Sequence, residues 1–263
     1  MPAERAGSSG LRRDIDLLQA LAGDEALQRG GLGVVRLAEL VQREKSQVSR
    51  ALRALEKVGL VERDPVTREY RLGWQLFGLA ARVGDMRLLQ SAPPIMRALV
   101  DELGESVHLC VLQANQVLTV LTEAPVHAFR ATGWVGRTFP AYCSSSGRAL
   151  LIDYTLDELA RRFLHTTFEP YGPVQLVHSV ADLFQQVQIA RRAGYAAVCE
   201  EFEAELVGVS APVRDFRGRI VASLNISAPK FRLHDKLDLA GRAAASYAAQ
   251  ISARMGSVRA ADI

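Results

Sequence analysis

The first third of the chain shows apolar residues at helical spacing, interrupted by short polar or glycine-rich breaks. Three such segments lie over residues 15–22, 37–41 and 45–57, and in each the apolar side chains recur as on one face of a helix. Gly59 follows the third segment and is typical of a helix end, because glycine adopts the left-handed conformation without strain. The pattern therefore predicts three helices, the last of which ends near Lys57.

Two short strand patterns follow the third helix. They lie over residues 60–63 and 69–72, and the intervening residues 64–68 contain the aspartate and proline that are typical of a turn. Three helices followed by such a hairpin are the elements of a winged helix-turn-helix unit.

The next segment, residues 73–91, again has a helical pattern. The pair Pro93-Pro94 should kink or restart this helix, because proline lacks the amide hydrogen that a helix interior needs. A further helix is predicted over residues 95–103, and we place the domain boundary near residue 88.

The rest of the chain mixes strand and helix patterns. Strands are predicted over 106–113, 117–123, 127–132, 196–201, 206–214 and 219–227, and helices over 147–153, 155–164, 180–192 and 235–254. A loop over 138–146 precedes the first of these helices. Thr155 and Glu158 form a capping box, and Ser179 caps the following helix. This order predicts an α+β fold in which helices cover a sheet.

The helix over 45–57 carries the most informative pattern. Its apolar residues share one face, and the opposite face presents Ser46, Arg50, Arg53 and Lys57. A solvated surface helix has the same pattern, but here a short helix precedes it by about three residues and a basic hairpin follows it. A helix in this context enters the major groove of B-DNA with its N-terminal side chains against base edges.

Seven residues of this unit are therefore candidate DNA contacts. They are Lys45, Ser46, Gln47, Ser49, Arg50, Arg53 and Arg68. Gln47 has the amide that pairs with adenine, and Arg50 can bind guanine or phosphate. Arg68 at the hairpin tip is placed for a minor-groove or phosphate contact.

The charge distribution favours an anionic partner for this unit alone. Residues 1–90 hold 15 Lys/Arg and 12 Asp/Glu, whereas residues 91–263 hold 17 of each, so the net charge of +3 comes from the first third. The 263 residues are 49% hydrophobic and 23% charged, as in an ordinary globular protein. The chain has no apolar stretch of membrane-spanning length, no apolar signal segment and no spaced pair among its three cysteines. We expect a cytoplasmic protein without a membrane span, a disulfide framework or a zinc site.

Two stretches of sequence resemble the IclR family of bacterial transcription regulators. Residues 45–63, KSQVSRALRALEKVGLVER, and Tyr70-Arg-Leu-Gly are similar to its DNA-binding domain. PAYCSSSGRALL, at residues 140–151, resembles the segment at the mouth of the family's ligand pocket, and residues 194–229 resemble its second signature. Order and spacing agree over most of the chain.

The resemblance implies a ligand-responsive regulator of two domains. A disordered tail over 1–10 would precede a winged helix-turn-helix DNA-binding domain over 11–72, a linker helix over 73–90 and a GAF-like effector-binding domain over 91–256. The implied partners are a double-stranded DNA operator, a small organic effector and further copies of the chain in a homodimer or tetramer. No cofactor is expected.

Alignment with the family places six residues in the effector pocket: Ser145, Ser146, Cys199, Gly208, Asn225 and Ser227. The helix start over 144–147 offers hydroxyl and backbone N–H groups that favour a carboxylate, but simple helix capping explains the same residues. A buried Asn225 needs partners, which a ligand or the protein could supply. Some relatives have an acidic residue near the position of Cys199 and a cysteine near that of Gly208, so no relative's effector can be transferred.

Other functions have weaker support in the sequence. Cys143 precedes three serines, but no G-x-S-x-G motif is present and Arg148 stands where an S-x-x-K site needs lysine, so we predict no enzyme. The glutamates over 200–205 favour a solvated loop or an intersubunit charge pair over a cation site. A protein-interaction module, with the winged helix used for dimerisation, is the alternative to DNA binding. Three aromatic residues either line the pocket or pack in the core: Trp134, Phe139 and Tyr142.

Overall fold

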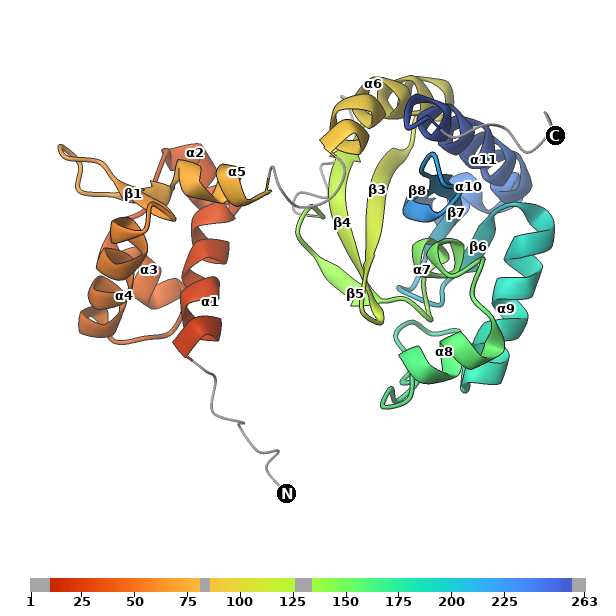
Figure 1. The fold of residues 1–263 in the computed structure, drawn as a ribbon, viewed down its shortest axis with the longest axis horizontal. Coiled ribbons are helices and arrows are strands. Elements are labelled where there is room, and N and C mark those ends of the chain that lie inside the picture. The colour runs from red at the N-terminus through yellow and green to blue at the C-terminus, as the bar shows by residue number, and fades with distance from the viewer. Residues whose placement is uncertain (1–9, 81–85, 126–133, 257–263) are drawn as a thin grey trace. The chain divides into compact units, whose positions relative to one another are not determined.

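The computed structural model describes residues 10–80, 86–125 and 134–256. The chain divides into two compact units, Met1–Met86 and Arg87–Ile263 (Figure 1). Each unit has a hydrophobic core of its own, and each is described by itself.

The described part of the first unit contains helices and one short hairpin. They are α1 (Gly10–Ala22), α2 (Asp24–Arg29), α3 (Val34–Leu40), α4 (Lys45–Lys57), β1 (Val61–Arg63), β2 (Tyr70–Leu72) and α5 (Trp74–Ala80). The three predicted helices and the hairpin are confirmed. The sequence pattern misses α2, because six residues are too few to show a helical period; Gly30, at φ 76°, ends it. The predicted tail over 1–10 lies outside the described residues apart from Gly10, which begins α1.

The core of the first unit joins the helices to the hairpin. Its buried residues run from Leu17 in α1 through Val48 and Leu52 in α4 to Tyr70 in β2. Tyr70 also exchanges two backbone hydrogen bonds with Leu32, at 2.9 and 2.8 Å. This bridge fixes the hairpin, which we call the wing, against the segment between α2 and α3.

The second unit is built on one antiparallel sheet. Its strands are β3 (Ser106–Gln113), β4 (Gln116–Glu123), β5 (Thr138–Pro140), β6 (Ala196–Cys199), β7 (Leu206–Arg214) and β8 (Ile220–Pro229). Their order across the sheet is β5-β4-β3-β8-β7-β6. The central strands β3 and β8 are far apart in sequence, so the middle of the sheet forms from both ends of this unit. The strand predicted over 127–132 lies outside the described residues.

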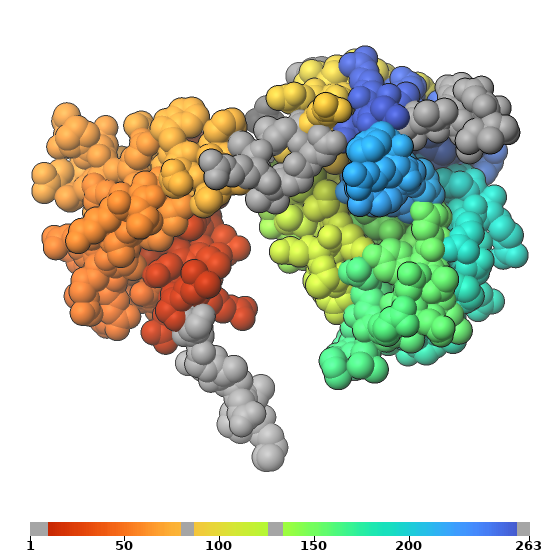
Figure 2. All heavy atoms as spheres, in the orientation of Figure 1, coloured from red at the N-terminus to blue at the C-terminus, as the bar shows by residue number. Residues whose placement is uncertain are grey.

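Helices cover the two faces of this sheet. They are α6 (Met86–Leu103), α7 (Ser145–Leu150), α8 (Leu156–Arg162), α9 (Val180–Ala193), α10 (Lys230–Leu233) and α11 (Leu237–Arg254), with a 3-10 turn over His234–Lys236. Figure 1 shows α6 and α11 together on one face, and Figure 2 shows side chains filling the spaces between these elements. Leu224 and Ile226 of β8 pack with α6 and α11, so Ser223, Asn225 and Ser227 point to the opposite face, beside α7.

Three sequence predictions differ from the structure. One continuous helix, α6, contains both Pro93 and Pro94, so the helix does not restart there; burial of its apolar face in the core offsets the lost hydrogen bonds. The predicted loop contains the short edge strand β5. Helix α7 begins at Ser145 rather than at Gly147, because Ser144 caps it by accepting a hydrogen bond from the Gly147 amide. The predicted caps at Thr155 and Ser179 are confirmed.

Candidate functional site

The solvent face of α4 presents the predicted DNA contacts. Val48, Leu52 and Leu55 are buried in the core of the first unit, which fixes the rotation of the helix. On the other side Lys45, Ser46, Gln47, Arg50 and Arg53 are exposed, and Ser49 is half-buried. The structure thus places six of the seven candidates on one helix.

The cations of this surface are unpaired, unlike Arg36 and Arg71 of the same unit. Arg36 binds Glu25 and Glu39, and Arg71 binds Glu62. Within the described residues, five side chains have no hydrogen bond or ion pair to the protein: Lys45, Arg50, Arg53, Lys57 and Arg68. Cations that are free of internal partners can neutralise phosphates without first breaking a salt bridge.

The seventh candidate, Arg68, lies at the tip of the wing. Its φ of 62° places it in the left-handed region, where it turns the chain back toward β2. The Asp64 carboxylate accepts hydrogen bonds from the amides of Val66 and Thr67, both at 2.8 Å, and these donors lower the pKa of Asp64. This turn holds the exposed Arg68 side chain away from the core.

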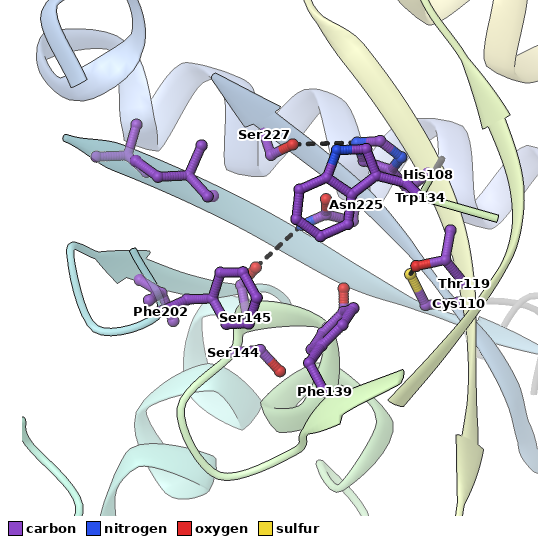
Figure 3. Close-up of a pocket in the computed structure, with 15 residues that line it drawn as sticks. His108, Cys110, Thr119, Trp134, Phe139, Ser144, Ser145, Phe202, Asn225 and Ser227 are labelled. Carbon is purple, nitrogen blue, oxygen red and sulfur yellow. Dashed lines mark hydrogen bonds between the residues drawn. The ribbon is translucent and has the colours of Figure 1, made fainter. Parts of the chain in front are cut away.

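The second unit contains a cavity between the sheet and the start of α7 (Figure 3). Its volume is about 50 Å³, counted as the space that the centre of a water molecule can reach. Its walls are His108, Cys110, Thr119, Trp134, Phe139, Ser144, Ser145, Ser146, Val198, Phe202, Leu206, Val207, Gly208, Asn225 and Ser227. Five of the six predicted effector residues are therefore together at one site.

Asn225 is the centre of the polar wall. Its Nδ2 lies 3.1 Å from Ser145 Oγ (Figure 3), 2.9 Å from Ser210 Oγ and 3.2 Å from the Val209 carbonyl oxygen. An amide nitrogen has two hydrogens, so these three acceptors exceed what it can donate to at once. Asn225 therefore ties the sheet to α7.

Gly208 makes space beside this cluster. It pairs with Ser227 on β8 and with Val198 on β6. A Cβ atom at Gly208 would lie 3.2 Å from Ser145 Oγ and 3.4 Å from Asn225 Nδ2. A larger side chain here would fill the space in front of the asparagine, so glycine keeps that part of the cavity open.

His108 on β3 completes the polar wall, and the alignment does not select it. Its Nδ1 lies 2.9 Å from Thr122 Oγ1 and its Nε2 lies 3.1 Å from Ser227 Oγ. The ring is 5% exposed, and burial lowers the pKa of His108 to about 4. The imidazole is therefore neutral at physiological pH. The alternation of side chains along β3 could have indicated His108, because His108 and Cys110 are two residues apart and share a face of the strand.

This buried histidine makes stability depend on pH. The unfolded chain binds a proton near the ordinary pKa of 6.5, above the folded value of about 4, so stability is lost as the pH falls through 6.5. We expect wild type to lose about 2 kcal/mol more than His108→Gln between about pH 7 and pH 5. Urea unfolding at both pH values measures this, with the exposed His165→Gln as control. Equal losses in wild type and His108→Gln would contradict the assignment.

Aromatic rings form the opposite wall. Phe202 lies 5.1 Å from Phe139 and 6.1 Å from Trp134 between ring centroids. Tyr142, the third aromatic candidate, donates its hydroxyl hydrogen to the Glu169 carbonyl oxygen and does not line the cavity. The sequence prediction missed Phe202, because it follows a strand in a loop whose path the pattern does not define.

Cys199 is the predicted effector residue that the structure does not bring to the cavity. Its neighbour Val198 lines the cavity, whereas Cys199 packs on the other face of the sheet, with its thiol 3.6 Å from His234 Nδ1. Successive residues of a strand point to opposite faces, so an alignment shift of one residue reverses the side.

Cys143 is buried, and burial raises its pKa to about 12, which suppresses the thiolate.

A buried ion pair joins α7 to the segment that follows β6. Arg148 and Glu201 are 1% and 3% exposed, and Arg148 Nη1 lies 2.9 Å from Glu201 Oε1. A second contact joins Nη2 to Oε2, and Nη2 also donates to the Tyr142 carbonyl oxygen at 3.3 Å. Arg148 belongs to the helix that carries Ser145, and Glu201 directly precedes Phe202. The pair therefore connects two walls of the cavity.

Two glutamates of the 200–205 loop, Glu200 and Glu201, form internal ion pairs. Glu200 binds Lys230, and this partner lowers the pKa of the Glu200 carboxyl. Glu201 binds Arg148. Across the part of the chain that the structure describes, no three His, Cys, Asp or Glu side chains gather as a metal site requires.

Comparison with known proteins identifies the chain. The sequence model described as "Bacterial transcriptional regulator IclR C-terminal" matches residues 80–253, which is most of the chain. The chain belongs to the IclR family. A second model, described as HVO_A0114, matches residues 12–72 of this IclR-family regulator.

Curated and solved relatives cover nearly the whole IclR-family chain. The HTH-type transcriptional regulator KdgR of Escherichia coli (strain K12) is 28% identical over 91% of this chain and 90% of its own. The HTH-type transcriptional repressor AllR of Escherichia coli (strain K12) is 27% identical over 97% and 93%. A crystal structure of an IclR homolog from Microbacterium hydrocarbonoxydans, complexed with 4-hydroxybenzoate, matches with a TM-score of 0.74 and 25% identity over 94% of this chain and 99% of that one.

The family membership and the α+β fold predicted from the sequence are thus confirmed. IclR proteins are transcriptional regulators, so the prediction against an enzyme agrees with the family. None of the helices in the described ranges is both long and apolar enough to span a membrane. The individual DNA and effector contacts stay predictions.

Proposed function

We propose that this regulator binds a pseudo-palindromic operator as a dimer, through the N-terminal half of α4 and the tip of the wing. In this proposal residues 11–72 form the DNA-binding domain and residues 91–256 the effector domain. The observation that carries it is the set of unpaired cations on α4 and at Arg68, in a unit where Arg29, Arg36 and Arg71 have acidic partners. Two such units related by a two-fold axis would match the two halves of a palindrome.

We further propose a small aromatic carboxylate as the effector. The cavity has an aromatic wall of Trp134, Phe139 and Phe202, opposite the amide of Asn225 and the hydroxyl groups at the start of α7. The Microbacterium hydrocarbonoxydans homolog is complexed with 4-hydroxybenzoate, which has a ring and a carboxylate of this kind.

The effector would act by binding two arrangements of the protein with different affinity, because only differential affinity shifts an equilibrium. His108 and Asn225 lie on β3 and β8, and α6 packs on the opposite face of these strands. A ligand that displaces either side chain would therefore change the strands against which α6 packs. The segment over 73–90 would then transmit this change from the effector domain to the DNA-binding domain.

Selection of genomic DNA fragments by the purified protein, at low and at high salt, tests the DNA-binding part. We expect a short palindromic motif whose affinity falls steeply with salt, because bound cations release counterions from phosphates. Candidate carboxylates, added during selection, test the effector part. Absence of enrichment with and without them would favour the alternative, in which the winged helix serves protein–protein contact.

Asn225→Ala separates the two functions. We expect affinity for the effector to fall by roughly tenfold or more, because a buried hydrogen-bonding group is lost, while DNA affinity without effector stays unchanged. Fluorescence anisotropy of labelled operator, with and without effector, measures both quantities.

Ser223→Ala is the matched control for this variant. Ser223 lies two residues earlier on β8, and its buried hydroxyl has no partner within the described residues and does not line the cavity. We expect it to respond to effector as wild type does. An unaltered response in Asn225→Ala would remove this residue from the effector site.

A further inference from the structure

The walls of the effector cavity carry no full charge. None of its described lining residues is Lys, Arg, Asp or Glu. An anion that enters such a cavity loses its hydration and meets neutral donors alone. Of the lining side chains, His108 is the one whose ordinary pKa lies near physiological pH, so a bound charge can change its protonation state.

Charged groups on the surrounding elements already have partners. Six form the ion pairs Arg97–Glu123, Arg232–Glu105 and Arg148–Glu201, and the Arg137 guanidinium lies over the outer Trp134 ring, 5.6 Å from its centroid. Cys110, on the same strand as His108, is buried, and burial raises its pKa to about 11, so its thiol stays neutral. Desolvation alone accounts for the lowered pKa of His108. Among the described residues, no neighbouring charge therefore favours either state of the imidazole.

The hydrogen bonds of His108 suit both protonation states. Both partners of the ring, Thr122 Oγ1 and Ser227 Oγ, are hydroxyl groups, at 2.9 and 3.1 Å. In the neutral ring, one nitrogen donates and the other accepts, so one hydroxyl must donate to the ring. In the protonated ring both nitrogens donate, and both hydroxyls can accept after a rotation of one O–H bond, without movement of heavy atoms.

This rotation has a consequence for the cavity. Ser227 lines it, and its hydroxyl hydrogen becomes free to point inward when Nε2 donates to Ser227 Oγ. A carboxylate would then receive a hydrogen bond from Ser227 and face an imidazolium directly behind it (Figure 3). An opposite charge within about 4–6 Å stabilises the protonated imidazole against the cost of burial.

We propose that a carboxylate effector binds together with one proton, which His108 takes up from solvent, so that the occupied cavity holds a neutral carboxylate–imidazolium pair. The inference rests on the proposed carboxylate class of the effector. No covalent bond changes in this step; the proton comes from the buffer and the imidazole gains one positive charge. Binding of effector would consequently strengthen as the pH falls toward about 6.

Isothermal titration calorimetry of the full chain with 4-hydroxybenzoate, in buffers of different ionisation enthalpy, counts the protons. We expect uptake of up to about one proton per ligand near about pH 6.5, and an affinity that falls by up to about tenfold per pH unit as the pH rises toward the pKa of His108 in the complex, above which the affinity levels off. The neutral 4-hydroxybenzamide should bind without proton uptake. His108→Gln should bind 4-hydroxybenzoate with no uptake and no pH dependence, whereas the surface control His165→Gln should match wild type.

The outcomes separate this inference from the proposed function. Binding of 4-hydroxybenzoate without proton uptake would overturn the role of His108 and leave the effector site intact. No binding of 4-hydroxybenzoate, or of benzoate titrated in the same way, would overturn the aromatic carboxylate class of effector, and the inference with it. Should His108→Gln fail to fold, nitrogen NMR of the wild-type imidazole decides instead: we expect both ring nitrogens to become protonated on ligand addition, and an unchanged neutral ring would contradict the proposal.

Discussion

Glu201→Ala is expected to lower the free energy of unfolding of the second unit by about 3–5 kcal/mol. The variant leaves Arg148, which is 1% exposed, as a buried cation without its carboxylate. Desolvation of that charge is then no longer offset by Coulomb attraction or by the two hydrogen bonds to Glu201. Urea unfolding followed by circular dichroism measures the loss.

Two further variants show whether the loss comes from the unpaired charge. The double variant Arg148→Met with Glu201→Leu removes both charges and fills much of the same side-chain volume with apolar atoms. It should therefore regain most of the free energy of unfolding that Glu201→Ala loses. Arg97→Ala breaks an exposed ion pair with Glu123 in the same unit and should cost at most about 1 kcal/mol. A similarly small loss in Glu201→Ala would mean that water reaches the buried pair.

The same ion pair also bears on the effector site. Arg148 and Ser145 share α7, and Glu201 is bonded in sequence to Phe202, so the pair fixes the distance between the polar and aromatic walls. Charge removal that restores stability without restoring effector affinity would show that the cavity needs this particular geometry.

Local signals in the sequence predicted much of the fold. The face of α4 followed from the spacing of Val48, Leu52 and Leu55, and the caps at Thr155 and Ser179 followed from side chains that bond to amides three residues away. Such features depend on neighbours in sequence, so a single chain contains the information that they need.

Long-range contacts could not be predicted in this way. Arg148 meets Glu201 across 53 residues, and His108 meets Ser227 across 119, and no local period links either pair. Tertiary burial also overrides local preference, as α6 shows by continuing through Pro93 and Pro94. The family alignment brought Asn225 and Gly208 to the cavity, but it selected Cys199, whose strand face is decided by pairing in the sheet.

Arg50→Ala is expected to weaken specific operator binding by about 1–3 kcal/mol, or roughly five- to 150-fold. Arg50 is exposed near the start of α4, and its guanidinium has no internal partner within the described residues. Its guanidinium can therefore donate two hydrogen bonds to one guanine, or bind a phosphate, without first breaking a salt bridge. Anisotropy titrations with operator and with unrelated DNA measure the effect, and Arg29→Ala, whose side chain lies beside Glu25 and Glu69, is the control.

The salt dependence of these titrations distinguishes the two roles of Arg50. A base contact predicts that operator binding weakens while binding to unrelated DNA is largely retained. A phosphate contact predicts that both weaken together, and that the slope of log affinity against log salt falls by about one. If Arg50→Ala and Arg68→Ala both bind operator as wild type does, the exposed cations of α4 and the wing do not contact DNA. The winged helix would then have to be assigned to contacts between proteins.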